Sequence, residues 1–438
     1  MKYGKINYIL AAVLLGFIIF WTYNIFFNDL FPVVEVEEEP YKGIINIWDY
    51  PRLNVETGSR YSWIEEKIES FEKRNPGVYI KFTPMDWNTL EDIEKEFSKG
   101  DKPDIIPVGN GFNYINMLEP LDEYIEDEEL KSIKIQALNG VDYKGQIIAY
   151  PVALTTYSMY LNLDLFNKKG VPPPNDGNWS YEEFVETLEK LTYTDEEEGI
   201  VDYFGFNSFI TPGYYNLWGI IMSDGAEIFN EKTDDYNFYG EEVINGLEKV
   251  IDLKEKYEVT PGFFGIMNEE ECWEMFYKDK KVAVYPTGSW AVKVLEDLEE
   301  KGEGFNFDVA NYPIGSINMP IVVSDGILSY GIMEQEDEKK KEMCVKFLKS
   351  LTEDTNQRSL EDIGLFTVKK DINDMYVNSP KMKKIEESLS YTFYLPLRDN
   401  WIDIDRILQE EIKKAIIGEK DSNKAIEDGE KRIEQLTK

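Results

Sequence analysis

The chain has 438 residues, of which 42% are hydrophobic, and its 84 acidic residues outnumber its 47 basic residues to give a net charge of -37. This excess of acid argues against binding to DNA or RNA, because neutralising phosphates requires a surplus of Lys and Arg. The chain contains no histidine, which excludes Ser-His-Asp and Cys-His mechanisms and His-ligated zinc. A chain of this length is expected to divide into two lobes.

The first segment, residues 1–30, is predicted to be an uncleaved signal anchor. Lys2 and Lys5 precede an apolar run, and about 20 such residues suffice for a helix to cross a hydrocarbon core. The residues after the run are bulky, so the small-residue cleavage site of a signal peptide is missing, and no Cys follows that could carry a lipid. The positive-inside rule then keeps the N-terminus in the cytoplasm and the body outside the cell, beyond an acidic linker at residues 31–40.

From Tyr41 onward, predicted strands and helices alternate, which is typical of an α/β fold. Strands are predicted at GIINIWDY (43–50), VYIKFTPMDW (78–87) and PDIIPVGNG (103–111). Helices are predicted at SWIEEKIESFEKR (62–74), LEDIEKEFSKG (90–100) and a segment starting at residue 180, with capping boxes formed by Ser62 with Glu65 and by Ser180 with Glu183. Cys272 and Cys344 lie in helical patterns, and we expect them to be small buried side chains more than a disulfide.

The segment YPVALTTYSMYLNLDLFNKKG, residues 150–170, has the apolar and β-branched residues of a strand but carries several hydroxyls in its middle. In open α/β sheets, ligands bind beyond the carboxyl ends of the strands. A strand that passes from one lobe to the other would line the cleft between them. We therefore expect the hydroxyls of Thr155 and Tyr157 to point into that cleft and to bind a polar ligand.

Several segments occur in a familiar order along the chain: FEKRNPGVYIKF, GDKPDIIPVGNG, MLEPLDEYI, GQIIAYPVALTTYSMYLNLDLFNKKGVPPP, YKDKKVAVYPTGSWAV, and FDVANYPIG with VVSDGILSYGI. In this order the chain resembles the extracellular solute-binding proteins of ABC importers, specifically the sugar-binding group that includes maltose-binding protein. The resemblance runs from about Gly43 to Leu436. The chain lacks the lipidated cysteine that usually anchors this family in organisms with a single membrane, and it has Thr155 where the maltose-binding relative has an acidic residue.

The resemblance implies a two-lobed α/β fold, similar to that of periplasmic binding proteins, with a cleft between the lobes and hinges near Val152, Pro313 and Thr352. Lobe 1 would hold residues 41–152 and 314–352, and lobe 2 residues 153–313 and 353–438.

A sugar presents flat C–H patches, on which aromatic rings stack, and hydroxyls that both donate and accept hydrogen bonds. The predicted stacking residues are Trp48, Tyr157, Tyr215, Trp218, Trp290 and Trp401. The predicted polar contacts are Asp49, Arg52, Asn110, Thr155, Asp325 and Arg398. Each has an alternative: Trp48 and Trp218 fit a lobe core equally well, and Asp49 and Arg52 fit a surface pair.

The sequence predicts a binding protein and not an enzyme, because it shows no nucleophile elbow, phosphate-binding loop or zinc motif. The 84 acids guarantee chance carboxylate pairs, so their number does not indicate a glycosidase. We expect a carbohydrate ligand, ABC permease subunits as partners, no cofactor or metal, no nucleic acid, and a monomer attached to the membrane by its N-terminal helix. The alternatives are a ligand-sensing module for a membrane signalling partner, a non-sugar solute such as a peptide, and a carbohydrate-cleaving enzyme.

Overall fold

The computed structural model comprises two compact units, Met1–Tyr41 and Lys42–Lys438. It describes residues 11–23, 41–85, 97, 102–194, 202–230, 233, 235–324 and 327–436. In the first unit, residues 11–23 form a helix. None of the described helices has the length and apolar character needed to cross a membrane. The remainder of the predicted anchor, together with most of the helix predicted at residues 90–100, lies outside the described residues.

The first sheet of the larger unit has six strands in the order β13-β6-β12-β3-β1-β2. β1 is parallel to β2 and β3, β12 is antiparallel to β3 and β6, and β13 is antiparallel to β6. Helices α2, α12 and α13 pack on this sheet, and we call the whole assembly lobe 1. Its elements are β1 (Gly43–Asp49), α2 (Ser62–Arg74), β2 (Val78–Pro84), β3 (Ile105–Pro107), α4 (Asp127–Ser132), α5 (Ile135–Asn139), β6 (Tyr150–Leu154), β12 (Ile327–Ile332), α12 (Glu338–Leu351), α13 (Asp354–Arg358) and β13 (Phe366–Thr367), with a small hairpin of β4 (Asp142–Tyr143) and β5 (Gln146–Ile147).

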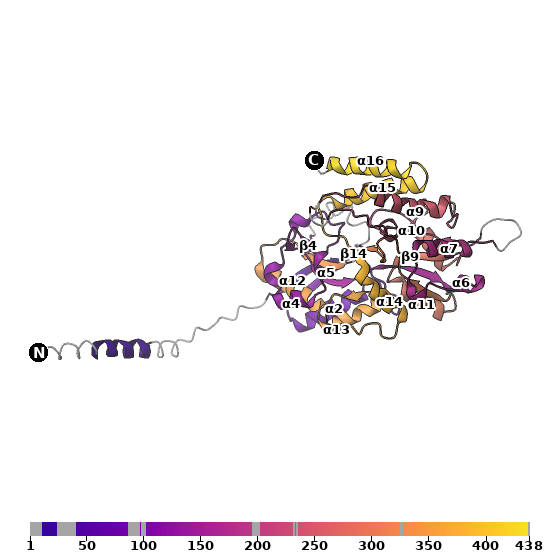
Figure 1. Ribbon diagram of the computed structural model, residues 1–438. Helices are drawn as coiled ribbons and strands as arrows, with labels where there is room; N and C mark the ends of the chain where they lie inside the picture. Colours follow the sequence, from indigo (N-terminus) through magenta and orange to yellow (C-terminus); the bar gives the residue numbers. More distant parts are fainter. Residues whose placement is uncertain are drawn as a thin grey trace. The chain divides into compact units, whose positions relative to one another are not determined.

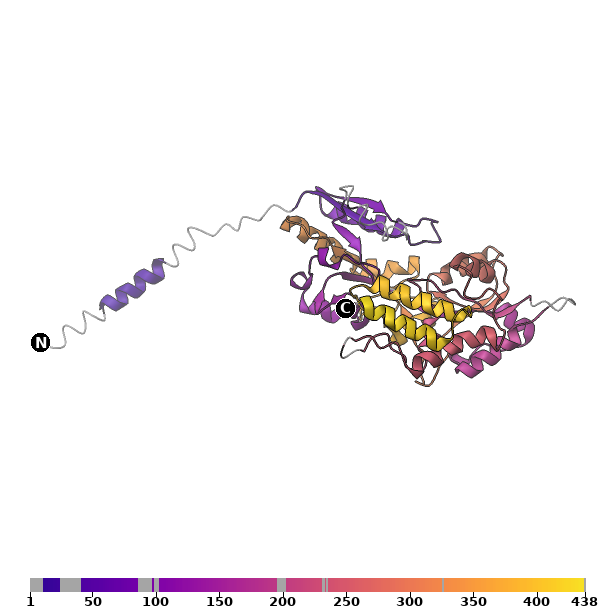
Figure 2. The ribbon, with the colours of Figure 1, turned by 90° about the horizontal axis from the view of Figure 1, so that it is seen from above.

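The second sheet has four strands in the order β10-β7-β9-β8, and we call it and its helices lobe 2. β7 is antiparallel to both β10 and β9, whereas β8 is parallel to β9. The outer helices α15 and α16 lie side by side and also contact α9 (Figures 1 and 2). The elements are β7 (Tyr157–Asn162), α6 (Leu163–Lys169), α7 (Tyr181–Leu191), β8 (Phe204–Phe206), α8 (Trp218–Ile221), α9 (Glu241–Glu255), α10 (Glu269–Tyr277), β9 (Val282–Gly288), α11 (Ala291–Glu300), β10 (Phe307–Ala310), α14 (Pro380–Ser388), α15 (Trp401–Ile416) and α16 (Ser422–Leu436).

Three links join the two sheets, and the third differs from the prediction. The first runs between β6 and β7, and the second between β10 and β12; the predicted hinges near residues 152 and 313 lie within β6 and after β10. Residues 353–438 were all expected in lobe 2, yet β13 pairs with β6 in the lobe 1 sheet, so the third link follows β13. A two-stranded parallel sheet of β11 (Val322–Ser324) and β14 (Thr392–Tyr394) joins the second and third links. The 3-10 helices are η1 (Ile115–Met117), η2 (Asp122–Tyr124), η3 (Asn175–Gly177), η4 (Ser359–Ile363) and η5 (Leu389–Tyr391).

Only one of the two predicted capping boxes forms. At the start of α7, the Ser180 hydroxyl accepts a bond from the Glu183 N–H, and the Glu183 carboxylate accepts one from the Ser180 N–H. The box at Ser62 is wrong, because Ser62 is already the first residue of α2 and Tyr61 takes the cap position without a side-chain bond. The Ser59 hydroxyl accepts hydrogen bonds from the Tyr61 and Ser62 N–H groups instead.

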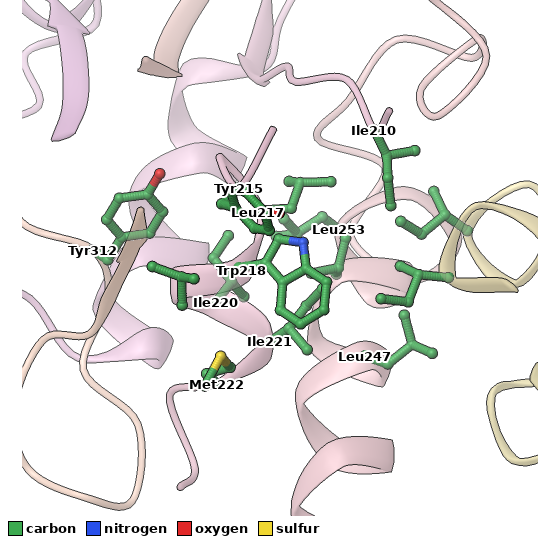
Figure 3. Packing of buried hydrophobic residues seen from close by; sticks show 14 of the residues in the cluster. Ile210, Tyr215, Leu217, Trp218, Ile220, Ile221, Met222, Leu247, Leu253 and Tyr312 are labelled. Atoms are coloured by element: carbon green, nitrogen blue, oxygen red, sulfur yellow. The ribbon is translucent and has the colours of Figure 1, made fainter. Parts of the chain in front are cut away.

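The core of lobe 2 forms around α8 and α9, two helices that approach each other at a glycine. Trp218 lies among Ile221, Leu247 and Leu253 in this cluster (Figure 3). A Cβ atom built on Gly246 of α9 would lie 1.8 Å from the Ile221 carbonyl oxygen of α8. The close contact therefore depends on a residue without a side chain, and it fixes the helix that follows loop 209–216.

Two side chains of helix α15 form hydrogen bonds with the backbone of loop 209–216. The Gly213 N–H donates to an Asp405 carboxylate oxygen at 2.6 Å, and the Gln409 amide donates to the Tyr214 carbonyl at 2.9 Å. Burial raises the pKa of the Asp405 carboxyl to about 6, and hydrogen bonds from Gly213, Gln409 and Tyr215 oppose that rise. The conformation of the loop is thus linked to a buried acid.

Gly246→Ala is expected to destabilise the protein, although alanine is the better helix former. Helix propensity alone would favour alanine by about 1 kcal/mol, but the clash with α8 should cost roughly 2–4 kcal/mol. Thermal unfolding of the two proteins measures the difference. Gly262→Ala is the control, because a Cβ atom there meets nothing within 4 Å. An unchanged or raised melting temperature for Gly246→Ala would contradict the packing described here.

Asp405→Asn is expected to remove part of the pH dependence of stability. The folded pKa of about 6 lies above the ordinary value of 3.8, so between these values the folded protein retains a proton that the unfolded chain has released. This group therefore stabilises the fold as pH falls through 6, by about 1 kcal/mol between pH 7.5 and pH 5. Urea unfolding of both proteins at the two pH values tests this. Identical pH dependence in the two proteins would show that Asp405 titrates normally.

Candidate functional site

A cavity of about 100 Å³ lies at the first link, on the lobe 2 side. Its wall comes from the link itself, from loop 209–216, from the first residue of α10, from the end of β9 with the start of α11, and from the last residue of β11. The lining residues are Thr155, Thr156, Tyr157, Phe209, Tyr214, Asn216, Glu269, Pro286, Thr287, Gly288, Trp290 and Ser324. Three of the predicted site residues, Thr155, Tyr157 and Trp290, are therefore brought together.

The hydroxyls of Thr155 and Thr156 in the first link form hydrogen bonds within the protein. Ser289 Oγ donates to the Gly364 carbonyl at 2.7 Å, so the 2.9 Å contact between Thr155 and Ser289 must have Thr155 as its donor. By the same reasoning Thr156 donates to Thr392, whose hydroxyl donates to a backbone carbonyl. Thr155 thus lines the cavity with its proton committed to Ser289, so toward a ligand its hydroxyl can only accept a hydrogen bond.

Trp290 is the one predicted tryptophan that stays accessible in the cavity wall. Its side chain is 40% exposed and packs edge-to-face on Trp273, with ring centroids 5.2 Å apart. A Cβ atom on Gly288 would lie 2.8 Å from the indole, so the ring needs glycine at this position to lie against β9. A Cβ atom on Gly364 would lie 3.2 Å from the Trp290 Cα, so this glycine also lies against Trp290. Backbone contacts on two sides therefore fix the position of the ring.

Asn216 is a lining residue that the sequence reasoning missed. Its side chain is 1% exposed, and its amide nitrogen donates to Ser208 Oγ at 2.6 Å and to the Phe209 carbonyl at 3.2 Å. The amide oxygen is buried and accepts no hydrogen bond within the described part of the chain. A signal was present in YYNLWGII, where one polar residue interrupts an apolar run, but the pattern alone gives no direction for the side chain.

Three predicted stacking residues belong to the lobe 2 core and not to the cavity wall. Tyr215 and Trp218 are each 1% exposed, and Figure 3 shows both among aliphatic side chains. Trp401 is 3% exposed, and its indole N–H donates to the Tyr215 hydroxyl at 3.1 Å. Each ring is covered by protein on both faces, so we assign these three residues to packing.

The predicted site residues of lobe 1 lie at the carboxyl ends of β1 and β3, outside the cavity lining. Arg52 donates to the buried Asp49 carboxylate at 2.6 Å; burial opposes the charge of Arg52, but Asp49 raises the pKa of Arg52 above its usual value. Trp48 packs on Phe97 in the lobe 1 core, with ring centroids 6.0 Å apart. Asn110 is buried, and its amide oxygen has no partner among the described residues.

The remaining predictions concern Arg398, Asp325, the cysteines and metals. The Arg398 guanidinium lies 3.6 Å from the centre of the Phe229 ring and does not line the cavity. Asp325 lies outside the described residues.

Cys272 and Cys344 are buried free thiols, as expected, and burial raises the pKa of each to about 12. In the part of the chain that is described, no group of three His, Cys, Asp or Glu side chains could hold a metal ion.

Comparison with known proteins gives both sequence relatives and structural neighbours. A binding protein of Brucella abortus is 23% identical over 395 residues, covering 86% of this chain and 90% of the relative. The maltotriose-binding protein of Pyrococcus abyssi is 24% identical over 339 residues, covering 70% of this chain and 67% of the relative. An ABC substrate-binding protein of Listeria monocytogenes, solved with cycloalternan, has a TM-score of 0.73 at 18% identity and covers 91% of this chain and 99% of the other.

The structural likeness shows a shared two-lobed α/β fold. The family model described as bacterial extracellular solute-binding protein matches residues 55–358, which is more than half of the chain and spans both lobes and the cavity. The chain belongs to the family of bacterial extracellular solute-binding proteins.

Proposed function

We propose that this protein is the extracellular substrate-binding component of an ABC importer and that it binds a sugar or oligosaccharide at the cavity beside Trp290. The observation that carries the proposal is the composition of that wall: an accessible indole and two tyrosines beside hydroxyl and amide groups. Membership of a solute-binding family supports the general role. The names of the Pyrococcus and Listeria relatives, with maltotriose and cycloalternan, favour an oligosaccharide.

Stacking and hydrogen bonding divide between different residues of the wall. Trp290 offers its exposed indole to the C–H face of a sugar ring, and Tyr157 and Tyr214 add further aromatic surface. The Thr287 hydroxyl and the Asn216 amide lie in the same lining and suit the hydroxyls of a ligand. A peptide would instead need groups that pair with its charged termini, and no Lys or Arg that could pair with a terminal carboxylate lies among the described lining residues.

Closure of the two lobes would complete the site. The lobe 1 residues Asp49, Arg52 and Asn110 follow strands whose carboxyl ends are the usual place for ligands in such sheets. A ligand that touches both lobes only in the closed state shifts the equilibrium toward closure by its differential affinity for that state. A permease that recognises the closed shape would then accept only the loaded protein, which we take to act as a monomer.

A hydrolytic role is disfavoured by the same wall. Glycoside hydrolysis uses two carboxyl groups placed about 5–10 Å apart across the bond to be cleaved. Glu269 is the one carboxylate among the described residues that line the cavity. The wall can therefore bind a glycosidic linkage without supplying the second acid that cleavage would require.

Trp290→Ala is expected to weaken sugar binding at least about tenfold, because an aromatic stack on the ligand is lost. The full-length chain is purified in a detergent without a sugar headgroup and screened by thermal shift with maltotriose, cycloalternan and other neutral di- and trisaccharides. Binding of the sugar with the largest shift is then measured by calorimetry for both proteins.

Phe263→Ala serves as the matched control, since Phe263 is a more exposed aromatic residue of lobe 2 outside the cavity. Equal affinity in wild type and Trp290→Ala would remove the proposed site. No shift with any sugar, together with a shift for peptides, would contradict the carbohydrate assignment and leave the family unchanged.

The N-terminal segment supports attachment to the membrane as part of this proposal. Helix residues 11–23 carry consecutive exposed apolar side chains, including Leu14, Phe17 and Ile18. A helix that is apolar on all sides requires an apolar environment, and the sequence continues the apolar run on both sides of the described part. We infer that this segment anchors the protein with its body outside the cell.

Replacing Leu14 and Ile18 together by Arg is expected to release the protein from the membrane. Each charge at the centre of a spanning helix costs roughly 2.5–3.5 kcal/mol. Cell fractionation with an alkaline wash measures the bound fraction. Ile266→Arg with Val377→Arg makes the same change at two exposed apolar residues of the body and should leave attachment unchanged. Retention of the Leu14/Ile18 double variant in the washed membrane would argue against the anchor.

A further inference from the structure

The described cavity wall carries a negative charge and no positive charge. Among its described lining residues, Glu269 carries the one carboxylate, and Lys and Arg are absent. Glu269 is the first residue of α10 and is exposed, so its charge acts on an approaching ligand through water and is screened by salt. In a chain whose net charge is already -37, this wall offers an anionic ligand no compensating positive charge.

Asn216, which lines the cavity, places a second constraint on the ligand that is independent of charge. Phe209 presents a backbone carbonyl, which can only accept, so the Asn216 atom 3.2 Å from it must be the nitrogen. That nitrogen also contacts Ser208 Oγ, which commits both amide protons and leaves Oδ1 as a buried acceptor without a partner among the described residues. Only a ligand atom or water that carries a hydrogen can satisfy it.

We propose that this wall selects neutral, hydroxyl-bearing sugars over acidic ones, with Asn216 Oδ1 accepting a hydrogen bond from a sugar hydroxyl and Glu269 repelling carboxylate or phosphate groups. The proposal rests on the function proposed above and specifies its substrate class. A carboxylate placed near Asn216 has no hydrogen to donate, so it would leave the buried oxygen unsatisfied and face like charge from Glu269. Both residues therefore act in the same direction, one by hydrogen bonding and the other by charge.

The test compares sugars that differ only in their acidic groups. The full-length chain, in a detergent without a sugar headgroup, is screened by thermal shift with galactotriose against trigalacturonic acid, mannotriose against trimannuronic acid, and glucose against glucose 6-phosphate. Maltotriose and cycloalternan complete the neutral set. We expect the sugars that bind to be neutral, with their acidic counterparts at least about tenfold weaker.

Two variants separate the contributions of the two residues. Glu269→Gln should reduce the discrimination against acidic sugars several-fold at low salt, measured as the ratio of the two affinities within each pair. Glu270→Gln is the matched control, because Glu270 lies in the same first turn of α10 but outside the lining. Asn216→Ala should weaken neutral sugars about tenfold, and its melting temperature without sugar shows whether it folds.

The outcomes distinguish this inference from the proposed function. An acidic sugar that binds as tightly as its neutral counterpart would overturn the selectivity while leaving a sugar-binding protein. Equal discrimination in wild type and Glu269→Gln would remove the role of Glu269, and unchanged neutral binding in a folded Asn216→Ala would remove that of Asn216. If no sugar of either kind binds, the carbohydrate function itself fails and the selectivity fails with it.

Discussion

The hydrogen bonds of Ser289 hold the first link between the lobes in place, and the cavity depends on them. Where the chain leaves one sheet for another, its backbone N–H and C=O groups lose the hydrogen bonds of strand pairing. These groups then need other hydrogen-bond partners. The Ser289 N–H donates to the Thr156 carbonyl, and its hydroxyl accepts from Thr155 and donates to Gly364 in lobe 1. One serine thus joins the link, the start of α11 and the turn of lobe 1 that precedes β13. Trp290 is the next residue, so the same bonds set where the exposed indole lies.

Loop 209–216, which forms another part of the cavity wall, is fixed by tight packing and buried polar hydrogen bonds. Gly246 allows α9 to approach α8, and α8 directly follows the loop that ends in Asn216. Asp405 holds the Gly213 N–H of that loop. A buried amide oxygen can remain unsatisfied only if the loop cannot turn it toward another donor. The packing of α8 and the hydrogen bonds from α15 therefore hold Asn216 where its Oδ1 stays without a partner among the described residues.

Sequence patterns predicted the fold well, but they could not sort the aromatic residues of the site. The strands at 43–50 and 103–111 and the Ser180 cap are local features, and they form as expected. Trp218, Trp290 and Trp401 all stand at the start of a helix, so their local patterns are alike. Two are in the core and one is exposed, because α8 and α15 begin inside lobe 2, whereas α11 begins at the link. That difference arises from tertiary packing, which spacing along the chain does not encode. The Ser62 box does not form because both of its N–H groups have other partners: the Ser62 N–H donates to Ser59 Oγ, and the Glu65 N–H donates to the Tyr61 carbonyl.

In the proposed closed site, the two lobes would contribute different chemistry. Lobe 2 would supply aromatic surface, the Asn216 acceptor and one carboxylate, from a wall without basic residues. Lobe 1 would supply the Asp49–Arg52 pair and Asn110, whose amide oxygen is also buried without a partner among the described residues. Arg52 is held by Asp49, so its charge is largely neutralised and it offers donors more than net attraction. A ligand with hydroxyls on both sides could satisfy an amide oxygen in each lobe at once, whereas a ligand that reaches only one lobe leaves the other oxygen buried and unpaired. The need to satisfy both amide oxygens would therefore favour closure around a polyhydroxylated ligand. Only a ligand long enough to reach both lobes would stabilise the closed state in this way.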